Sequence, residues 1–290
     1  MAGLVHGQPE QRMLSGRTRL AVWGDPIDHS RSPALHSAAY RELGLDWDYG
    51  RRRVSEGEFA RALDDRDATW RGLSLTMPLK HAAATASVWL DPDARLTGAV
   101  NTLLLDDGAP RGFNTDVGGL VRALSEIGVD APQRVRVLGA GATATSAVVA
   151  AARLGARSIE VRARRPEAAA PLVELGQALS APVAAAPLDT PAPSTVDVTI
   201  ATLPGGTDLG PVAGELASVG GPLVDVVYGG WPTPLARAWE HAGHAAHDGL
   251  GMLVHQALLQ VRVFVSGEPA VPLDREDAVL AAMRGAVVGG

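Results

Sequence analysis

Val135-Arg136-Val137-Leu138-Gly139-Ala140-Gly141-Ala142-Thr143-Ala144 is the most informative stretch of this chain. The apolar run Val135–Leu138 predicts a buried strand, and the Ala-rich residues after the glycines predict a helix that extends to Leu154. Gly139 permits a tight turn and Gly141 lets a ligand approach the backbone, where free N–H groups and the helix dipole favour an anion. We therefore predict that residues 139–143 bind the pyrophosphate of a dinucleotide. The plainer alternative is a tight strand-to-helix turn without a ligand.

A basic turn follows the next predicted strand, Ser158–Arg162. The sequence there reads Arg162-Ala163-Arg164-Arg165, and the first acidic residue after it is Glu167. In a Rossmann unit an acid about 20 residues after the glycines binds the ribose 2′-hydroxyl of NAD. Guanidinium groups instead bind the 2′-phosphate of NADP, often bidentately. The turn therefore favours NADP over NAD, although a solvated basic turn would have the same sequence.

Strands and helices alternate on both sides of this unit, which predicts an α/β fold with two domains. We expect an N-terminal α/β domain with a mainly parallel sheet, formed by residues 18–116 plus 251–290, and a Rossmann-type domain at 117–250. The predicted strands are Arg19–Trp23, Trp47–Val54, Gly72–Leu75, Val135–Leu138, Ser158–Arg162, Asp197–Ala201 and Leu223–Val227. The predicted helices are Ser32–Leu43, Glu56–Leu63, one from Leu79, Val117–Ile127, one ending at Leu154, and a helical region from Leu250 to the end of the chain.

Turn residues refine this assignment. Ser32 is expected to be an N-cap, with Pro33 at the first helical position. Asn101–Leu105 and Arg111–Phe113 are expected to form a hairpin around Asp106-Asp107-Gly108. The Ala/Pro-rich residues 181–194 are expected to form a short strand and a loop.

Composition excludes several classes of protein. The 290 residues carry a net charge of −6 and no cysteine, which argues against a nucleic-acid partner and rules out disulfides, thiolate zinc sites and a cysteine nucleophile. No apolar stretch reaches the length of a membrane span, and residues 1–17 lack the apolar core of a secretory signal. We expect a cytoplasmic protein, monomeric or homodimeric, with a small-molecule substrate. No metal is expected, because His241, His244 and His247 lie on a surface-like segment and three histidine ligands need one convergent face.

Polar residues gather where strands of the first half end. The clusters are Ser30-Arg31-Ser32, Ser74–Lys80, Asn101-Thr102 and Asn114-Thr115-Asp116. Each alone is explained by turn chemistry, helix capping or a solvated charge. Their order along the chain carries more information than any single cluster.

That order resembles the shikimate dehydrogenase family, from about Leu20 to Gly267. The matching stretches are Gly24–Pro33 (Gly-Asp-Pro-Ile-Asp-His-Ser-Arg-Ser-Pro), Leu75–Lys80, Gly98–Thr102, Asn114–Asp116, Gly139–Gly141, Asp225–Tyr228 with Thr233–Leu235, and Gly249–Gln256. Any one of these motifs is common. Seven in the family's order are highly specific.

The resemblance implies a reversible, NADPH-dependent reduction of 3-dehydroshikimate to shikimate in the biosynthesis of chorismate and the aromatic amino acids. It implies that Lys80 and Asp116 are the catalytic pair. Substrate-binding residues would be Ser30, Ser32, Thr76, Asn101, Tyr228 and Gln256. Cofactor-binding residues would be Gly139, Ala140, Gly141, Ala142, Thr143, Arg162, Arg164, Arg165, Thr202, Val226, Gly249 and Met252.

The chemistry agrees with this assignment. Reduction of a ketone needs a hydride donor and a proton for the developing alkoxide, and a lysine ammonium oriented by a carboxylate can supply that proton. No metal is required.

The chain also departs from the family pattern. Ser74 stands where the family usually has an asparagine, and Ala163 where it usually has an arginine, so that Arg164 or Arg165 would have to bind the phosphate. Ile200 and Gly229 each replace a further asparagine.

The sequence is also compatible with three alternatives. One is a quinate or quinate/shikimate dehydrogenase using NAD, since Ser30 and Ser32 do not distinguish the two acids. Another is a catalytically silent relative that senses such a ligand. The third is a dinucleotide-binding protein with unrelated chemistry, which leaves the polar clusters of the first half unexplained.

Overall fold

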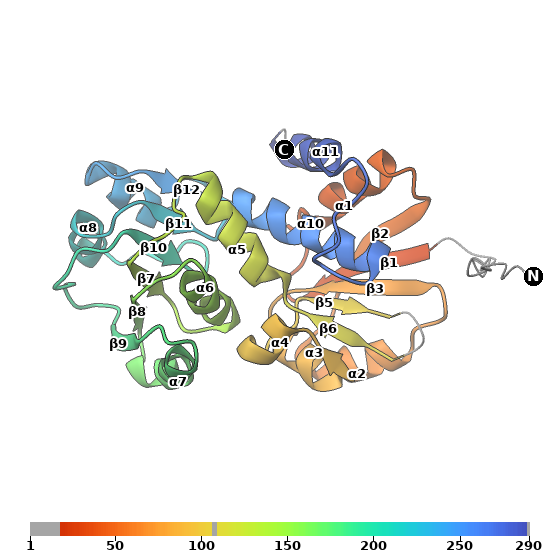
Figure 1. Cartoon of the computed structure of the whole chain (residues 1–290), viewed down its shortest axis with the longest axis horizontal. Helices are drawn as coiled ribbons and strands as arrows, with labels where there is room; N and C mark the ends of the chain where they lie inside the picture. The colour runs from red at the N-terminus through yellow and green to blue at the C-terminus, as the bar shows by residue number, and fades with distance from the viewer. Residues whose placement is uncertain (1–17, 106–108, 289–290) are drawn as a thin grey trace, which may run out of the picture.

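The computed structural model describes residues 18–105 and 109–288. Figure 1 shows two lobes joined by two long helices, α5 and α10. The first lobe contains one six-stranded sheet and the second lobe contains another. An α/β fold with two such units agrees with the prediction.

The elements of the first lobe and of the joining helices come from both ends of the chain. They are β1 (Thr18–Gly24), α1 (Ser32–Glu42), β2 (Trp47–Arg53), α2 (Glu56–Asp64), β3 (Trp70–Leu75), α3 (Lys80–Ala86), β4 (Trp89–Leu90), α4 (Pro92–Thr97), β5 (Thr102–Leu104), β6 (Arg111–Phe113), α5 (Thr115–Glu126), α10 (Leu250–Ser266) and α11 (Glu276–Val288).

The second lobe is continuous in sequence. Its elements are β7 (Arg134–Leu138), α6 (Ala142–Arg153), β8 (Ser158–Ala163), the 3-10 helix η2 (Pro166–Ala169), α7 (Ala170–Ala178), β9 (Val183–Pro187), β10 (Val198–Ala201), α8 (Pro211–Ser218), β11 (Leu223–Asp225), α9 (Pro234–His241) and β12 (Ala246–His247).

The sheet of the second lobe is a Rossmann sheet. All its strand pairs are parallel, and their order is β9-β8-β7-β10-β11-β12. This is the doubly wound order, whose direction reverses between β7 and β10. Ligands bind at that switch point, outside the carboxyl ends of the strands. The loop at residues 139–141 therefore follows β7 at the position where a nucleotide is expected.

The sheet of the first lobe is mixed. β1 pairs in parallel with β2 and β3, whereas β5 pairs antiparallel with β3 and β6 and forms the predicted hairpin. The turn assigned to Asp106-Asp107-Gly108 lies outside the described residues. Two short elements, β4 and α4, were not predicted, because their lengths are too short for a hydrophobic period to be visible.

The start of α1 corrects one prediction. Arg31, not Ser32, precedes the helix, and no side chain caps it. Ser32 is the first helical residue, and its backbone N–H instead donates to Ser30 Oγ at 3.3 Å. The Ser30 hydroxyl therefore contacts the first backbone N–H of the helix but does not act as its N-cap.

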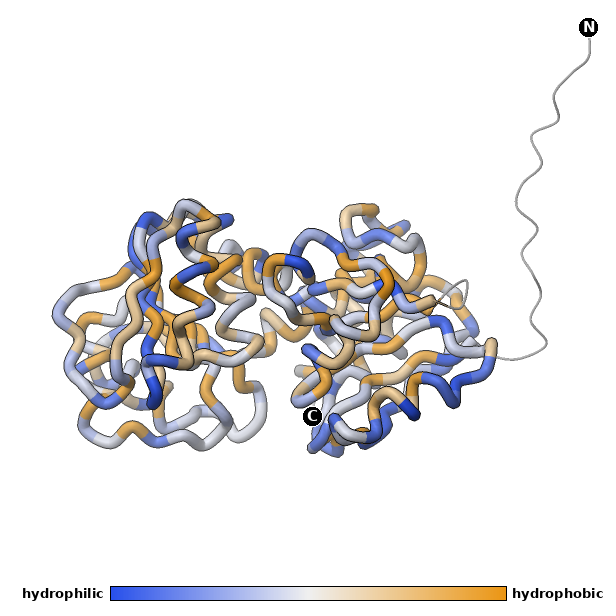
Figure 2. Tube along the Cα trace, turned by 90° about the horizontal axis from the view of Figure 1, so that it is seen from below, coloured by the Kyte–Doolittle hydropathy of each residue, from blue (hydrophilic) through white to orange (hydrophobic). Residues whose placement is uncertain are grey.

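Both faces of the first sheet are covered. Along β1, Leu20 and Val22 pack towards α1, α10 and α11, whereas Ala21 and Trp23 pack towards α2 and α3. This alternation follows from the two-residue period of a strand. Hydrophobic segments, drawn in orange, run through both lobes in Figure 2.

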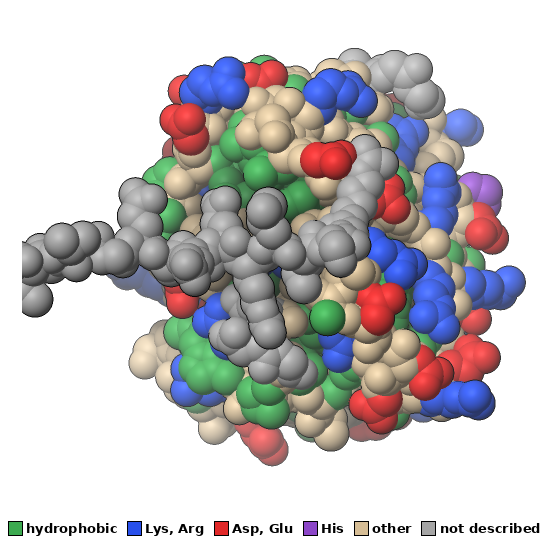
Figure 3. All heavy atoms as spheres, turned by 90° about the vertical axis from the view of Figure 1, so that its right-hand side faces the viewer, with side chains coloured by type: hydrophobic (Ala, Val, Ile, Leu, Met, Phe, Trp, Pro, Cys, Tyr) green, Lys and Arg blue, Asp and Glu red, His purple; other side chains and the backbone are tan. Residues whose placement is uncertain are grey.

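The outer surface is more polar. Figure 3 shows the end of the first lobe that faces away from the second, where basic and acidic side chains are interspersed over the part not covered by grey atoms. Among the described residues, no helix is both long enough and apolar enough to cross a membrane.

Helices α5 and α10 cross from one lobe to the other and pack against each other. Their first residues lie next to the two predicted domain boundaries, 116/117 and 250/251. Those boundaries stay predictions. The helices nevertheless bring Asp116, at the start of α5, and Gln256, within α10, to the junction of the lobes.

Candidate active site

A buried ion pair lies at the junction of the two lobes. Lys80, the first residue of α3, donates from Nζ to Asp116 Oδ2 at 2.6 Å. The two side chains are 13% and 6% exposed. A pair so shielded from water is screened little by salt and interacts more strongly than a surface pair. Lys80 Nζ also lies 3.5 Å from Thr143 Oγ1, at the start of α6 in the second lobe.

Asn101 fixes the orientation of the carboxylate. Its Nδ2 donates to Asp116 Oδ1 at 2.8 Å and lies 3.4 Å from Gln256 Oε1. Its Oδ1 accepts from the backbone N–H of Thr115 at 2.9 Å. Asn114 caps α5 by accepting from the backbone N–H groups of Asp116 and Val117. The clusters at 101–102 and 114–116 thus form one hydrogen-bonded unit around Asp116.

A cavity of about 320 Å³ opens beside this unit. It is lined by the predicted catalytic pair and by every residue predicted to bind substrate: Ser30, Ser32, Thr76, Asn101, Tyr228 and Gln256. Its volume and its few convergent polar groups are typical of a site for a small polar molecule.

Tyr228 reaches this cavity from the second lobe. Burial raises the pKa of its phenol, and the Arg31 guanidinium, 6.0 Å from the ring centroid, partly offsets that rise. The phenol is therefore protonated near neutral pH and available as a hydrogen-bond donor.

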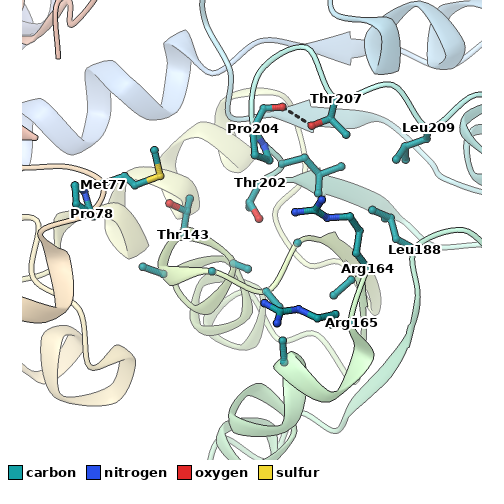
Figure 4. A pocket seen from close by; sticks show the side chains of 18 of the residues that line it. Met77, Pro78, Thr143, Arg164, Arg165, Leu188, Thr202, Pro204, Thr207 and Leu209 are labelled. Atoms are coloured by element: carbon teal, nitrogen blue, oxygen red, sulfur yellow. Dashed lines mark hydrogen bonds between the residues drawn. The ribbon is translucent and has the colours of Figure 1, made fainter. Parts of the chain in front are cut away.

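A larger cavity of about 1040 Å³ lies over the switch point of the second lobe. Its walls include residues 139–144 after β7 and Thr202 after β10, and Met77 and Pro78 of the first lobe close one side (Figure 4). Gly139 has φ +115°, and a Cβ there would lie 2.4 Å from Thr202 Oγ1. A Cβ at Gly141 would meet no atom within 4 Å, so this backbone faces open space. Helix α6 begins at Ala142 without a side-chain cap.

Two guanidinium groups point into the larger cavity. The side chains of Arg164 and Arg165 project from the turn after β8 towards the space between the glycine loop and Thr202 (Figure 4). Both are exposed, and neither has an ion-pair partner among the described residues. A helix start and two free cations at the ends of adjacent parallel strands favour binding of a polyanion.

Arg162 does not belong to this set, which corrects one prediction. Its side chain is only 2% exposed and pairs with Glu160, and it also donates to the backbone carbonyls of Thr190 and Pro191. It does not line either cavity. Arg162 holds the 190–191 loop through these bonds. Ala163, the next residue, lines the larger cavity instead, because alternate residues of a strand point to opposite faces.

Three other expected cofactor residues lie in an unexpected place. Val226, Gly249 and Met252 line the smaller cavity, whereas Thr202 and residues 139–143 line the larger one. If these three residues contact a cofactor, they would contact the end of the cofactor that lies closest to the junction of the two lobes. The two cavities share Thr76, Lys80 and Thr143 in their walls, so they meet at the Lys80–Asp116 pair.

Two buried polar residues of the smaller cavity were missed. Ser74 and Gln260 line the smaller cavity and are 3% and 2% exposed. Both could have been found from periodicity, since Ser74 in β3 precedes Thr76 by two residues and Gln260 follows Gln256 by four residues in α10.

One further signal distinguishes Lys80. It is the only lysine in the chain, and every other long cationic side chain is an arginine. In a sequence that otherwise uses arginine for its long cationic side chains, the one amine lies in the buried ion pair between the cavities.

A Rossmann sheet, a nucleotide-sized cavity and a small polar cavity that meet at a Lys–Asp pair define a two-lobed dinucleotide-dependent oxidoreductase. Comparison with known proteins specifies the family. Residues 22–103 match the family model described as the shikimate dehydrogenase substrate binding domain. The chain is 35% identical over 280 residues to the shikimate dehydrogenase (NADP(+)) of Methanothermobacter thermautotrophicus, covering 92% of this chain and 98% of that protein.

Solved structures agree. The shikimate dehydrogenase of Mycobacterium tuberculosis is 38% identical with a TM-score of 0.79, covering 92% of this chain and 99% of that one. The shikimate 5-dehydrogenase of Thermus thermophilus, solved in complex with NADP(H) and shikimate, is 30% identical with a TM-score of 0.76, covering 93% and 99%. The chain belongs to the shikimate dehydrogenase family.

Proposed function

We propose that this protein is a shikimate dehydrogenase, which interconverts 3-dehydroshikimate and shikimate with NADPH and NADP. The observation that carries the proposal is the Lys80–Asp116 pair, 2.6 Å apart, at the place where the larger and smaller cavities meet. A cofactor in one cavity and a ring in the other would bring their reacting atoms together there. The reaction belongs to the biosynthesis of chorismate and the aromatic amino acids.

The residues of the larger cavity fit NADP. The uncapped start of α6 and the open backbone at Gly141 suit a pyrophosphate, and Arg164 and Arg165 suit a 2′-phosphate. When bound, the cofactor supplies the hydride in the reductive direction and accepts it in the oxidative direction.

Lys80 handles the proton. In reduction, its ammonium group donates a proton to the ketone oxygen as negative charge develops there, and in oxidation the neutral amine accepts the proton of the alcohol. Asp116 holds Nζ in position, and Asn101 holds Asp116 through a bond of 2.8 Å. Arginine could supply the charge but not the proton transfer, because its pKa is too high. This explains why the single lysine of the chain lies here.

The smaller cavity binds the ring in a fixed orientation. Ser30, Ser32 and the protonated phenol of Tyr228 offer hydroxyl donors for the substrate carboxylate. Thr76, Asn101 and Gln256 lie around the Lys80–Asp116 pair and suit the ring hydroxyls. The cytoplasmic location and the choice between monomer and homodimer stay predictions from the sequence.

Steady-state kinetics tests the proposal. Purified protein is offered shikimate or quinate with NADP or NAD, and the reduced nicotinamide is followed by absorbance. We expect the highest kcat/KM with shikimate and NADP. A preference for quinate or NAD would reassign the protein within its family, and no turnover of any combination would contradict the proposed reaction.

A further inference from the structure

Four buried side chains form a hydrogen-bonded chain beneath the smaller cavity. Tyr49 of β2 donates from its hydroxyl to Ser74 Oγ of β3 at 2.6 Å. Ser74 Oγ lies 2.7 Å from Gln260 Oε1 of α10, and His36 Nε2 of α1 lies 3.1 Å from the same oxygen. Only Ser74 and Gln260 reach the cavity wall. Tyr49 and His36 lie behind them, with their rings stacked at 4.0 Å.

The direction of every bond in this chain follows from one backbone carbonyl. Gln260 Nε2 donates to Asn101 O at 3.1 Å, which fixes the orientation of the amide because a carbonyl oxygen can only accept. Gln260 Oε1 therefore faces Ser74 and His36 and must accept from both. Ser74 thus uses its single hydrogen on Gln260, and the Tyr49 hydroxyl must donate to Ser74.

The protonation state of His36 agrees with these bond directions. Burial lowers its pKa to about 3, so the ring is neutral at physiological pH. Its Nε2 carries the hydrogen that Gln260 accepts, and its Nδ1 accepts from the Tyr40 hydroxyl at 3.1 Å. No member of the chain can reverse its polarity without leaving a buried donor or acceptor unpaired, which is costly.

Ser74 therefore presents the cavity with a lone pair and no hydrogen. We propose that Ser74 is a specificity-determining residue whose Oγ accepts a hydrogen bond from one non-reacting ring hydroxyl of the substrate, and that Tyr49 is a positioning residue that holds Ser74 as an acceptor. The inference rests on the proposed function, since it assigns one part of the substrate to this wall. A ketone or carboxylate oxygen placed there would face another acceptor and remain unpaired.

The side-chain amide of Gln260, next to Ser74, also favours a substrate hydroxyl at this wall. Gln260 Nε2 has a second hydrogen besides the one given to Asn101 O. A hydroxyl group at this wall can donate to Ser74 and accept from Gln260, which neither a carbonyl nor a hydrogen atom can do. Selectivity here depends on bond polarity as well as on size.

A double-mutant cycle between protein and substrate tests the assignment. The value of kcat/KM is measured for wild type and Ser74→Ala with shikimate and with two analogues, one lacking the 4-hydroxyl and one lacking the 5-hydroxyl. We expect Ser74→Ala to lower kcat/KM for shikimate about three- to tenfold, mainly through KM. For one analogue this loss should disappear, because the hydroxyl that Ser74 accepts is already missing. For the other analogue the loss should persist.

Controls separate this role from a structural one. Tyr49→Phe should weaken the coupling, because Ser74 is then held only by Gln260. Tyr40→Phe removes a phenol from the far end of the same chain and should leave the coupling unchanged, although it lowers the melting temperature. Ser74→Cys, close to serine in size but a poor acceptor, replaces Ser74→Ala if the alanine variant does not fold.

The outcomes are distinct. A wild type that does not turn over shikimate contradicts the proposed function. A wild type that does, with Ser74 coupled to neither hydroxyl, contradicts the role of Ser74 alone.

Discussion

Gly119 of α5 lies against Gln256 of α10 so closely that a Cβ at position 119 would be 2.7 Å from the Gln256 Cβ and 2.9 Å from its backbone nitrogen. Contacts under 3.0 Å at a Cβ force something to move, and here the obstacle includes helix backbone. The absence of a side chain at 119 therefore sets the spacing of the two helices that cross between the lobes. It also sets the position of Gln256 relative to Asn101 and Asp116.

Gly119→Ala should displace α10 and with it the Gln256 side chain. We expect a loss of about 1–3 kcal/mol in the free energy of unfolding, as is typical of overpacking. The KM for shikimate should rise more than the KM for NADP, because Gln256 lines only the smaller cavity. Denaturant unfolding and steady-state kinetics measure the two effects.

The neighbouring glycine provides a matched control. A Cβ at Gly118 would meet only the end of the flexible Leu259 side chain, at 2.7 Å. Gly118→Ala should therefore be tolerated. Equal effects of the two substitutions would contradict a specific role for the contact between Gly119 and Gln256.

Much of this arrangement could be predicted from the sequence, because its strongest signals are local. The apolar run and glycines at 135–141 predict a strand, a turn and a helix from neighbouring residues alone. The polar clusters at 74–80 and 114–116 follow β3 and β6, and the cluster at 101–102 begins β5, which runs antiparallel to both, so the three clusters meet at one edge of the sheet. Thr76, Lys80, Asn101 and Asp116, which line the smaller cavity, belong to these clusters, whereas Tyr228 and Gln256 were predicted only from the family resemblance.

The rest depends on contacts between distant residues. Arg162 occurs in a basic turn, and only the fold shows that its side chain is buried, pairs with Glu160 and lines neither cavity. Tyr49 and His36 are separated from Gln260 by about two hundred residues, so no local pattern could place them in one hydrogen-bonded chain. Short elements such as β4 and α4 carry too few residues to show a period.

Cofactor preference should depend on Arg164 and Arg165. Replacing either with alanine removes a charged donor from the larger cavity, a loss of roughly 1.5–3 kcal/mol for a bond to phosphate. We expect the KM for NADP to rise about 10- to 100-fold and the KM for NAD to change little. Arg157→Ala, an exposed arginine near the other end of β8, is the control and should leave both values unchanged. Equal losses with NAD and NADP would show that the two arginines do not recognise the 2′-phosphate.

Asp91 should make the free energy of unfolding fall as pH rises, whereas most carboxylates in folded proteins have the opposite effect. Burial raises its pKa from 3.8 to about 6, while backbone N–H groups of Ala94 and Asn114 partly offset this. Because the folded state then binds a proton that the unfolded state has lost, the Asp91 contribution to the free energy of unfolding falls as pH rises from about 4 to 6. The penalty at pH 7 is of order 3 kcal/mol.

Asp91→Asn keeps the Oδ1 acceptor of these two bonds and cannot ionise. It should therefore be more stable than wild type at pH 7 and nearly equal to it at about pH 4. Urea unfolding at both pH values measures the difference, with Asp130→Asn, an exposed carboxylate, as the control. A stability difference that is the same at both pH values would contradict the raised pKa.

Lys80→Arg distinguishes proton transfer from simple charge. The guanidinium keeps a positive charge beside Asp116, whose Oδ2 accepts from Nζ at 2.6 Å in the wild type, but it cannot release a proton in the working pH range. If Lys80 transfers the proton, Lys80→Arg and Lys80→Met should both lose about 100-fold or more in kcat, with the KM for NADP nearly unchanged. If Lys80 acts only as a fixed charge, the arginine variant should retain most of its activity. Because Lys80 is the only lysine, isotopic methylation of the wild type labels a single ε-amine, and its NMR signal should shift when shikimate binds.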